Sequence, residues 1–242
     1  MTAAAAARCA GRLAWEPGHC HEEDPQGGNP AGPMPVQLRF DTGLAGADYV
    51  NRELWRRAIL PRCPLHPRGG CGLVRHGSYE RKRPAGTRIA RWYCPQGHCT
   101  FSLLPDHLAS RFPGTLAEIE QVAAAAEVAS SLEACAHELR PDPVGLPSAL
   151  RWVRRRLTVV RTLLPLAVTL LPALLQGCAA TVTAVRQRLQ VPNALERLRA
   201  LLARELPALA PPLGLRHRRR GSGDGHGGLQ QHMGPDPPPA AA

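Results

Sequence analysis

The chain contains very few aromatic side chains and a single lysine, Lys82. Aromatic residues are only 4% of its 242 residues, whereas 23 glycines and 25 prolines interrupt it throughout. So little bulky apolar side chain, with so many interruptions, excludes one large continuous core. We therefore expect small ordered units, with a disordered leader over residues 1–35 and a disordered tail over residues 211–242.

A secretory signal is also lacking at the start of the sequence. The first residues have no basic region, and the alanine run is short and interrupted by Arg8, unlike a signal peptide. We expect a cytoplasmic, nucleoid-associated protein whose cysteines stay reduced. In that compartment, closely spaced cysteines favour a metal site over disulfides.

The charge is strongly positive and almost entirely arginine. The formal net charge is +11, which favours a polyanionic partner, nucleic acid first. A GC-rich genome would by itself enrich arginine, alanine, proline and glycine. The positions at which the arginines cluster therefore count for more than their number.

Residues 61–113 hold six side chains that can bind a metal. The stretch "RCPLHPRGGCG" contributes Cys63, His66 and Cys71, and "YCPQGHC" contributes Cys94, His98 and Cys99. Between them, "LVRHGSYERK" and "TRIARWYC" alternate and are joined by "RPAG", which predicts a β-hairpin. A hairpin with a ligand-bearing turn at each end is the layout of a zinc ribbon, in which the metal replaces a core that is too small.

A cysteine pair precedes "RHG" and a basic hairpin, and a cysteine-containing turn then runs into "TFSLLP". With these motifs, the segment from about residue 61 to 160 resembles the zinc-ribbon front of insertion-sequence transposases and related bacterial proteins of unassigned function. Similar domains also carry "RW", here Arg151-Trp152. The resemblance implies a zinc ribbon over residues 36–113 followed by a helix-turn-helix over residues 114–161.

One departure from that pattern bears on the metal ligands. Where the family has Cys-x2-Cys, this chain has Cys94-Pro-Gln-Gly97, so the fourth ligand has to be His98 or Cys99. We prefer His98, because the preceding glycine can relax the turn. His66 has Cys-x2-His spacing from Cys63 but lies between prolines, and whether it or Cys99 replaces one of the ligands is left open. The expected set, binding a structural zinc, is Cys63, Cys71, Cys94 and His98.

Residues 114–161 carry the signals of three helices. Thr115 and Glu118 form a capping-box pattern before an apolar periodicity. "LEACAHELR" and "LPSALRWVRRRLTVVRTLL" follow, and the basic third helix would be the recognition helix. The cations that we expect at DNA are Arg75, Arg81, Lys82, Arg83, Arg88 and Arg91 from the hairpin, and Arg151, Arg154, Arg155 and Arg156 from that helix.

Residues 162–210 are expected to form a helical extension. Residues 162–185 carry no charge and are long enough to span a bilayer. Pro165 and Pro172 more plausibly divide them into short buried helices that pack on the amphipathic run "NALERLRALLARELPAL". A membrane span is the less favoured alternative.

We expect no transposase catalytic site among these residues. Strand transfer needs three carboxylates that hold two metal ions, but beyond residue 161 the only acids are Glu196, Glu205, Asp224 and Asp236. We therefore expect a zinc-stabilised, sequence-specific protein that binds double-stranded DNA, has no small-molecule substrate and is not an enzyme. A protein-interaction adaptor is the alternative, and a homodimer or a partner protein of a mobile element is left open.

Overall fold

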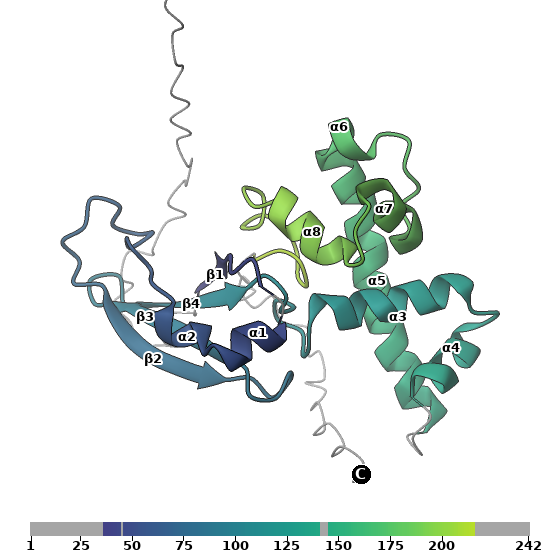
Figure 1. Ribbon diagram of the computed structural model, residues 1–242, viewed down its shortest axis with the longest axis horizontal. Helices are drawn as coiled ribbons and strands as arrows, with labels where there is room; N and C mark the ends of the chain where they lie inside the picture. The colour runs from purple at the N-terminus through teal and green to yellow at the C-terminus, as the bar shows by residue number, and fades with distance from the viewer. Residues whose placement is uncertain (1–35, 45, 141–144, 216–242) are drawn as a thin grey trace, which may run out of the picture.

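The computed structural model describes residues 36–44, 46–140 and 145–215. The expected leader, residues 1–35, and the tail beyond residue 215 fall outside these ranges. In the described part, a four-stranded sheet with two short helices is followed by a helical half (Figure 1).

The sheet consists of β1 (Val36–Phe40), β2 (Val74–Glu80), β3 (Arg88–Cys94) and β4 (Cys99–Pro105), in the spatial order β1-β4-β3-β2. The strands β2 and β3 form the antiparallel hairpin predicted from the two alternating runs. The strand β4 returns antiparallel to β3, and β1 then pairs with β4 in parallel. The result is a small mixed sheet, larger than the predicted hairpin.

Two short helices, α1 (Gly46–Asn51) and α2 (Leu54–Arg57), pack against this sheet. Their aromatic residues Tyr49 and Trp55 are buried with Ala90 of β3 and Leu103 of β4. The Tyr49 hydroxyl donates a hydrogen bond of 2.7 Å to the carbonyl of Arg88. Two of the chain's few aromatic side chains therefore build the core that the sheet needs on this face.

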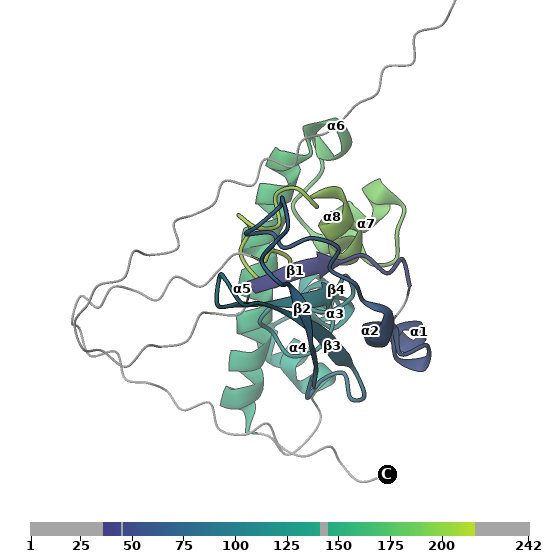
Figure 2. The same cartoon turned by 90° about the vertical axis from the view of Figure 1, so that its left-hand side faces the viewer.

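The helical half consists of α3 (Leu116–Val128), α4 (Leu132–Leu139), α5 (Leu146–Leu170), α6 (Pro172–Leu175), α7 (Val182–Leu189) and α8 (Ala194–Leu201). The predicted capping box is present at the start of α3: the Thr115 side chain accepts from the Glu118 backbone, and the Glu118 carboxylate accepts from the Thr115 backbone. Figure 2 shows α5 as the long helix of this half, with α3, α4, α7 and α8 to its right.

The helix α5 is longer than predicted, because Pro165 lies inside it and does not end it. A proline inside a helix costs about 3 kcal/mol. Here Leu163, Leu164 and Ala167 are buried on either side of it, and such packing outweighs local propensity. Pro172, as predicted, begins a new helix. As a result, α5 runs through position 161, where we expected a domain to end.

One core cluster spans the sheet and the helices. It contains Ile89 and Leu104 from the sheet together with Leu116, Leu164 and Leu198 from three helices. The segments predicted as separate domains, 36–113 and 114–161, therefore share buried apolar surface. A change that unfolds the sheet is consequently expected to weaken the helical half as well.

Two carboxylates on α3 hold the beginnings of the last two helices. Glu120 is fully buried and accepts the backbone N–H groups of Ala194 and Leu195 at the start of α8. Two helical turns further along α3, Glu127 accepts the N–H groups of Val182 and Thr183 at the start of α7. Carboxylates are favourable at helix N-termini, because they satisfy free N–H groups and complement the helix dipole.

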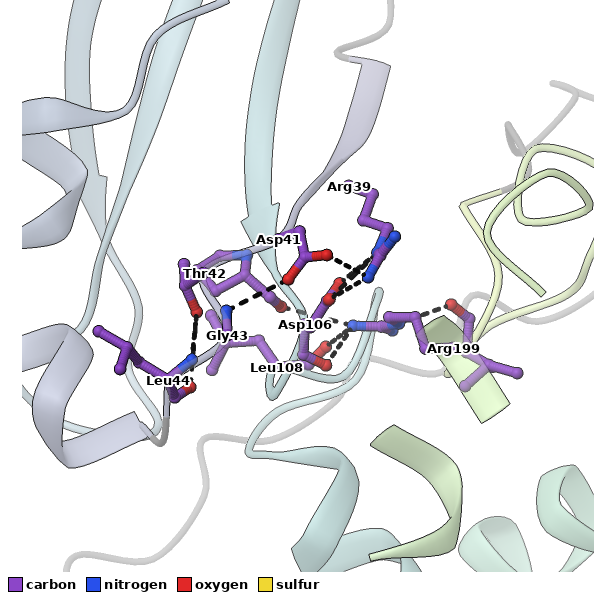
Figure 3. A network of polar contacts seen from close by, with 10 residues as sticks. Arg39, Asp41, Thr42, Gly43, Leu44, Asp106, Leu108 and Arg199 are labelled. Carbon is purple, nitrogen blue, oxygen red and sulfur yellow. Dashed lines mark hydrogen bonds and ion pairs between the residues drawn. The ribbon is translucent and has the colours of Figure 1, made fainter. Parts of the chain in front are cut away.

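The buried side chain of Arg199 ties α8 to the loop after β4 and to the last described residues (Figure 3). It donates to the carbonyls of Asp106, Leu108, Pro212 and Leu213 at 2.5–3.0 Å. Burial lowers its pKa to about 10. The expectation that the tail begins at residue 211 is wrong for residues 211–215, because this arginine and the core hold them in place.

The uncharged run 162–185 lies in the end of α5, in α6 and at the start of α7. Among the described residues, no helix combines the length and the apolar composition that crossing a membrane requires. Leu175, Val182 and Val185 of this run are instead buried in the protein's own core.

Candidate metal centre and basic surface

Four potential metal ligands meet at one end of the sheet. Cys63, His66 and Cys71 come from the loop between α2 and β2, and Cys94 is the last residue of β3. Their ligand atoms all lie within 4.8 Å of one another. The three cysteines are buried and the histidine is half-buried. This Cys3His cluster could hold a metal ion, because four ligand atoms this close can surround one cation.

The loop that carries three of the ligands is shaped by tight turns. The His66 N–H donates to the carbonyl of Cys63 at 3.1 Å, and three glycines take the left-handed backbone conformation: Gly69, Gly70 and Gly72. Consequently, His66 Nδ1 lies 3.6 Å from Cys63 Sγ and 3.3 Å from Cys94 Sγ. The Cys-x2-His spacing thus puts both of its side chains in the cluster.

The surroundings of the sulfurs suit thiolates bound to a cation. Burial raises the pKa of Cys63 to about 11, while the N–H groups of Leu65 and His66 lower it. The Gly97 N–H donates to Cys94 Sγ at 3.2 Å, which also favours the negative sulfur. A thiol this buried is neutral near pH 7 on its own, so a metal ion has to supply the positive charge that ionises it.

His98, which we expected as the fourth ligand, lies outside the cluster. Its side chain is exposed, its backbone is left-handed with φ 43°, and its Nδ1 is 3.4 Å from the Tyr93 hydroxyl. A Cβ placed on Gly97 would lie 3.4 Å from Cys94 Sγ and 3.7 Å from His66 Cε1. Position 97 therefore faces the cluster and position 98 faces away, and His66 occupies the place of the missing side chain.

Cys99, the other alternative, begins β4 directly opposite Cys94. Its side chain is buried in the same small cluster as Val36 and Phe101. That cluster also contains Cys63, Cys71 and Cys94, but Cys99 does not belong to the group of four close ligand atoms.

Several of the hairpin arginines bind the protein itself. The Arg75 guanidinium donates to the carbonyls of Trp55 and Arg56 at 2.5 and 2.8 Å. The Arg81 guanidinium donates to Ala109 and Phe112, and burial lowers its pKa. Arg88 bonds Ser78, and Arg91 lies over the Tyr79 ring. Only Lys82 and Arg83 of this group are exposed without such a contact among the described residues.

The arginines of α5 divide between two faces. Arg151, Arg154 and Arg155 are exposed. Arg156 is buried, with its guanidinium 4.0 Å from the centre of the Trp152 ring, because it lies on the face that packs inward. Arg161, which the sequence analysis did not single out, is exposed on the same side as Arg154, seven residues earlier.

His107, in the loop after β4, is a buried titratable residue that sequence reasoning missed. Only 4% of it is exposed, and neither ring nitrogen has a hydrogen-bond partner among the described residues. Burial, and to a lesser extent the charges of Arg199 and Arg81, together lower its pKa to about 4. In an unfolded chain the same group titrates near 6.5. The folded protein therefore holds His107 neutral where the unfolded chain would bind a proton.

We expect His107 to make the protein less stable in acid. Between pH 6.5 and 4 the unfolded state binds more protons than the folded state. The stability that comes from keeping His107 neutral is therefore fully present above pH 6.5 and is lost as the pH falls to about 4. The loss amounts to about 3 kcal/mol of the free energy of unfolding. The measurement is the free energy of unfolding against pH for the wild type and His107→Leu. The two curves should converge or cross as the pH falls; parallel curves would contradict the assignment.

Comparison with known proteins adds no relative: no family model, no curated protein and no solved structure matches this chain.

Proposed function

We propose that the protein binds double-stranded DNA through the exposed face of α5, and that a zinc ion at the Cys3His cluster stabilises the sheet beside it. In this proposal α3, α4 and α5 act as a helix-turn-helix, with α5 in the major groove, and the sheet is a variant of the zinc ribbon. The resemblance to the front of insertion-sequence transposases supports the same reading. Zinc is a structural ion here and takes part in no reaction.

The choice of zinc follows from the ligands. Three thiolates and one imidazole are a typical tetrahedral zinc set, whereas magnesium and calcium take oxygen ligands. Four protein ligands fill the coordination sphere and leave no position for a substrate. The zinc would hold the loop of Cys63, His66 and Cys71 against the end of β3 at Cys94, where few apolar side chains are available.

The observation that carries the DNA proposal is the composition of α5. Its 25 residues, Leu146–Leu170, include no aspartate or glutamate. Arg151, Arg154, Arg155 and Arg161 are exposed along it, and Arg154 and Arg161 form no ion pair with any described carboxylate. From Arg151 to Arg161 this face extends about 15 Å. An α-helix fits into the major groove of DNA, and the phosphates of the two strands then flank the helix on both sides.

The opposite face of α5 explains how these arginines are presented. Ala149, Val153 and Leu157 are buried, and α5 contacts both α3 and α4. Because the inner face is fixed in the core, the outer arginines project from a rigid helix. Phosphate contacts from such a helix cost less conformational entropy than contacts from a loop.

We expect Arg151→Gln/Arg154→Gln to bind duplex DNA about tenfold more weakly, because it loses two cations at phosphates or base edges. Neither guanidinium supports the core, so the variant should unfold at the temperature of the wild type. The control is Arg57→Gln/Arg204→Gln, which removes two exposed arginines outside α5. Fluorescence anisotropy with a short duplex measures the affinities. Equal losses in both variants would reduce the effect to overall charge and contradict α5 as the interface.

A further inference from the structure

We infer that the protein has a second phosphate-contacting surface, made by Arg111 of the loop 110–114 together with Lys82 and Arg83 of the neighbouring hairpin turn. This surface contacts the same duplex as α5. This inference rests on the proposed function of α5. It adds Arg111 to the interface and assigns a role to the loop that connects β4 with α3.

The loop is fixed to the turn of the β2–β3 hairpin on one side. The half-buried guanidinium of Arg81, just after β2, donates to the carbonyls of Ala109, at 3.1 Å, and Phe112. The Gly114 N–H donates to the carbonyl of Arg83 at 3.4 Å. The turn that carries Lys82 and Arg83 therefore lies directly against residues 109–114.

On its other side the loop touches α5. The Arg155 guanidinium lies 5.1 Å from the centre of the Phe112 ring, within the range of a cation–π contact. The Phe112 carbonyl thus accepts from Arg81 at the hairpin turn, and the Phe112 ring lies against Arg155 of α5. Two groups of cations that lie about seventy residues apart in the sequence meet at this loop.

Arg111 projects from the loop between two anchors. Ser110 is fully buried, and its hydroxyl donates to Gln37 of β1 at 2.8 Å. Gly114 is buried as well. Between them Arg111 takes a left-handed backbone with φ 56°, and its side chain is exposed. A non-glycine residue rarely adopts this conformation, and here it forms the outward tip of a firmly held loop.

No acid of the described residues forms an ion pair with Lys82, Arg83 or Arg111. The closest acids along the chain are engaged elsewhere: Asp106 pairs with Arg39 at 2.7 Å, Glu118 accepts the Thr115 N–H at 2.9 Å, and Glu80 lies 4.0 Å from Arg88. The surface around the loop therefore keeps a local charge that attracts phosphates.

A duplex fits this arrangement better than a single strand. It offers a groove for α5 and, at the edge of that groove, a row of phosphates for cations beside the helix. The loop lies beside α5 at Arg155, near the middle of the basic face. Arg111, Lys82 and Arg83 would bind the backbone of one strand and fix how far α5 enters the groove.

The test compares Lys82→Gln/Arg83→Gln/Arg111→Gln with a control that loses the same charge elsewhere, Arg52→Gln/Arg57→Gln/Arg204→Gln. Duplex affinity is measured by anisotropy between about 50 and 200 mM salt. We expect the first variant to reduce the slope of log affinity against log salt by about 2 to 3, near 0.9 for each lost phosphate contact. The control should keep the slope of the wild type, and Arg111→Gln alone should lower it by about 1.

Three outcomes separate the two proposals. If the loop variant behaves like its control while Arg151→Gln/Arg154→Gln loses affinity, the second surface is wrong and the role of α5 stands. If the wild type binds no duplex at low salt, the proposed function fails, and this inference fails with it. If a single strand of the same length binds as tightly, with the same loss in the loop variant, the duplex is not the partner of this surface.

Discussion

Replacing His66 with alanine is expected to abolish tight metal binding, whereas replacing His98 with alanine should leave it unchanged. His66 Nδ1 lies within 3.6 Å of two cluster sulfurs, and His98 is exposed beside Tyr93. Loss of a residue that only hydrogen-bonds a metal ligand lowers metal affinity by up to about 100-fold. Loss of one of the four ligands themselves should therefore lower zinc affinity by more than about 100-fold. Titration against a chromophoric chelator measures the affinity of each purified variant.

The same replacement should destabilise the sheet, because binding free energy of a structural zinc is folding free energy. We expect the zinc-loaded wild type to unfold at a higher temperature than His66→Ala, and EDTA to remove the difference. If His98→Ala loses the metal and His66→Ala keeps it, the ligand set that we describe is wrong.

Gly97 offers a rescue experiment for this assignment. A side chain at position 97 would point at Cys94 Sγ and His66 Cε1, although its Cβ would come within 2.6 Å of the Leu65 side chain. Leu65 is half-buried and can move its terminal methyl group. In His66→Ala/Gly97→Cys the new thiolate should occupy the vacated place and restore much of the affinity. Rescue by a cysteine at position 98 instead would contradict the geometry of this turn.

Replacing Glu120 with alanine is expected to cost about 3–5 kcal/mol of the free energy of unfolding. The carboxylate is fully buried and accepts from Ala194 and Leu195 at 2.8 and 2.7 Å, as well as from Arg186 at 2.5 Å. Its removal leaves two N–H groups of α8 and one guanidinium without their partner, and breaking a buried charge pair costs this much. Guanidinium unfolding followed by circular dichroism measures the change.

Glu127→Ala is the matched control on the same helix. It caps α7 in the same manner, but at a more exposed place, so we expect a loss of about 1 kcal/mol, as for an ordinary helix cap. Because α8 belongs to the shared core, Glu120→Ala should also lower the cooperativity of unfolding. A loss below about 1 kcal/mol in Glu120→Ala would show that α8 does not depend on this carboxylate.

The local signals in the sequence predicted the local structure well. The alternating runs around "RPAG" form β2 and β3, and Thr115 with Glu118 forms the capping box. These features depend on neighbouring residues, so a short window contains all the information. The strand pairing of β1 with β4 is different, because it joins residues more than sixty positions apart.

The choice between His66 and His98 could not be made from spacing. It depends on which position of the turn at residues 95–98 faces the cluster. A side chain at position 97 would face it, but that residue is a glycine, and the side chain of His98 is exposed. The Cys63-x2-His66 spacing was the one signal in favour of His66. Its flanking prolines argue against it, yet the loop has three left-handed glycines and brings that imidazole to the sulfurs.

Long-range contacts also decided which cations are exposed. The sequence grouped Arg154, Arg155 and Arg156 together, but the helical period puts Arg156 against Trp152 and the core. The Arg81 guanidinium points inward and donates to the carbonyls of Ala109 and Phe112 in the loop after β4. The roles of Glu120 and Arg199 were invisible for the same reason, because each bonds residues from distant segments.

The most direct test of the account is the binding of a random-sequence duplex by the zinc-loaded wild type over a range of salt concentrations, repeated after complete removal of the metal. We predict that log affinity falls steeply and linearly with log salt, as it does when several phosphates are neutralised. We also predict that the metal-free protein binds far more weakly, since the sheet and α5 share one core. Absence of binding at low salt, or binding that is unchanged without the metal, would contradict the account.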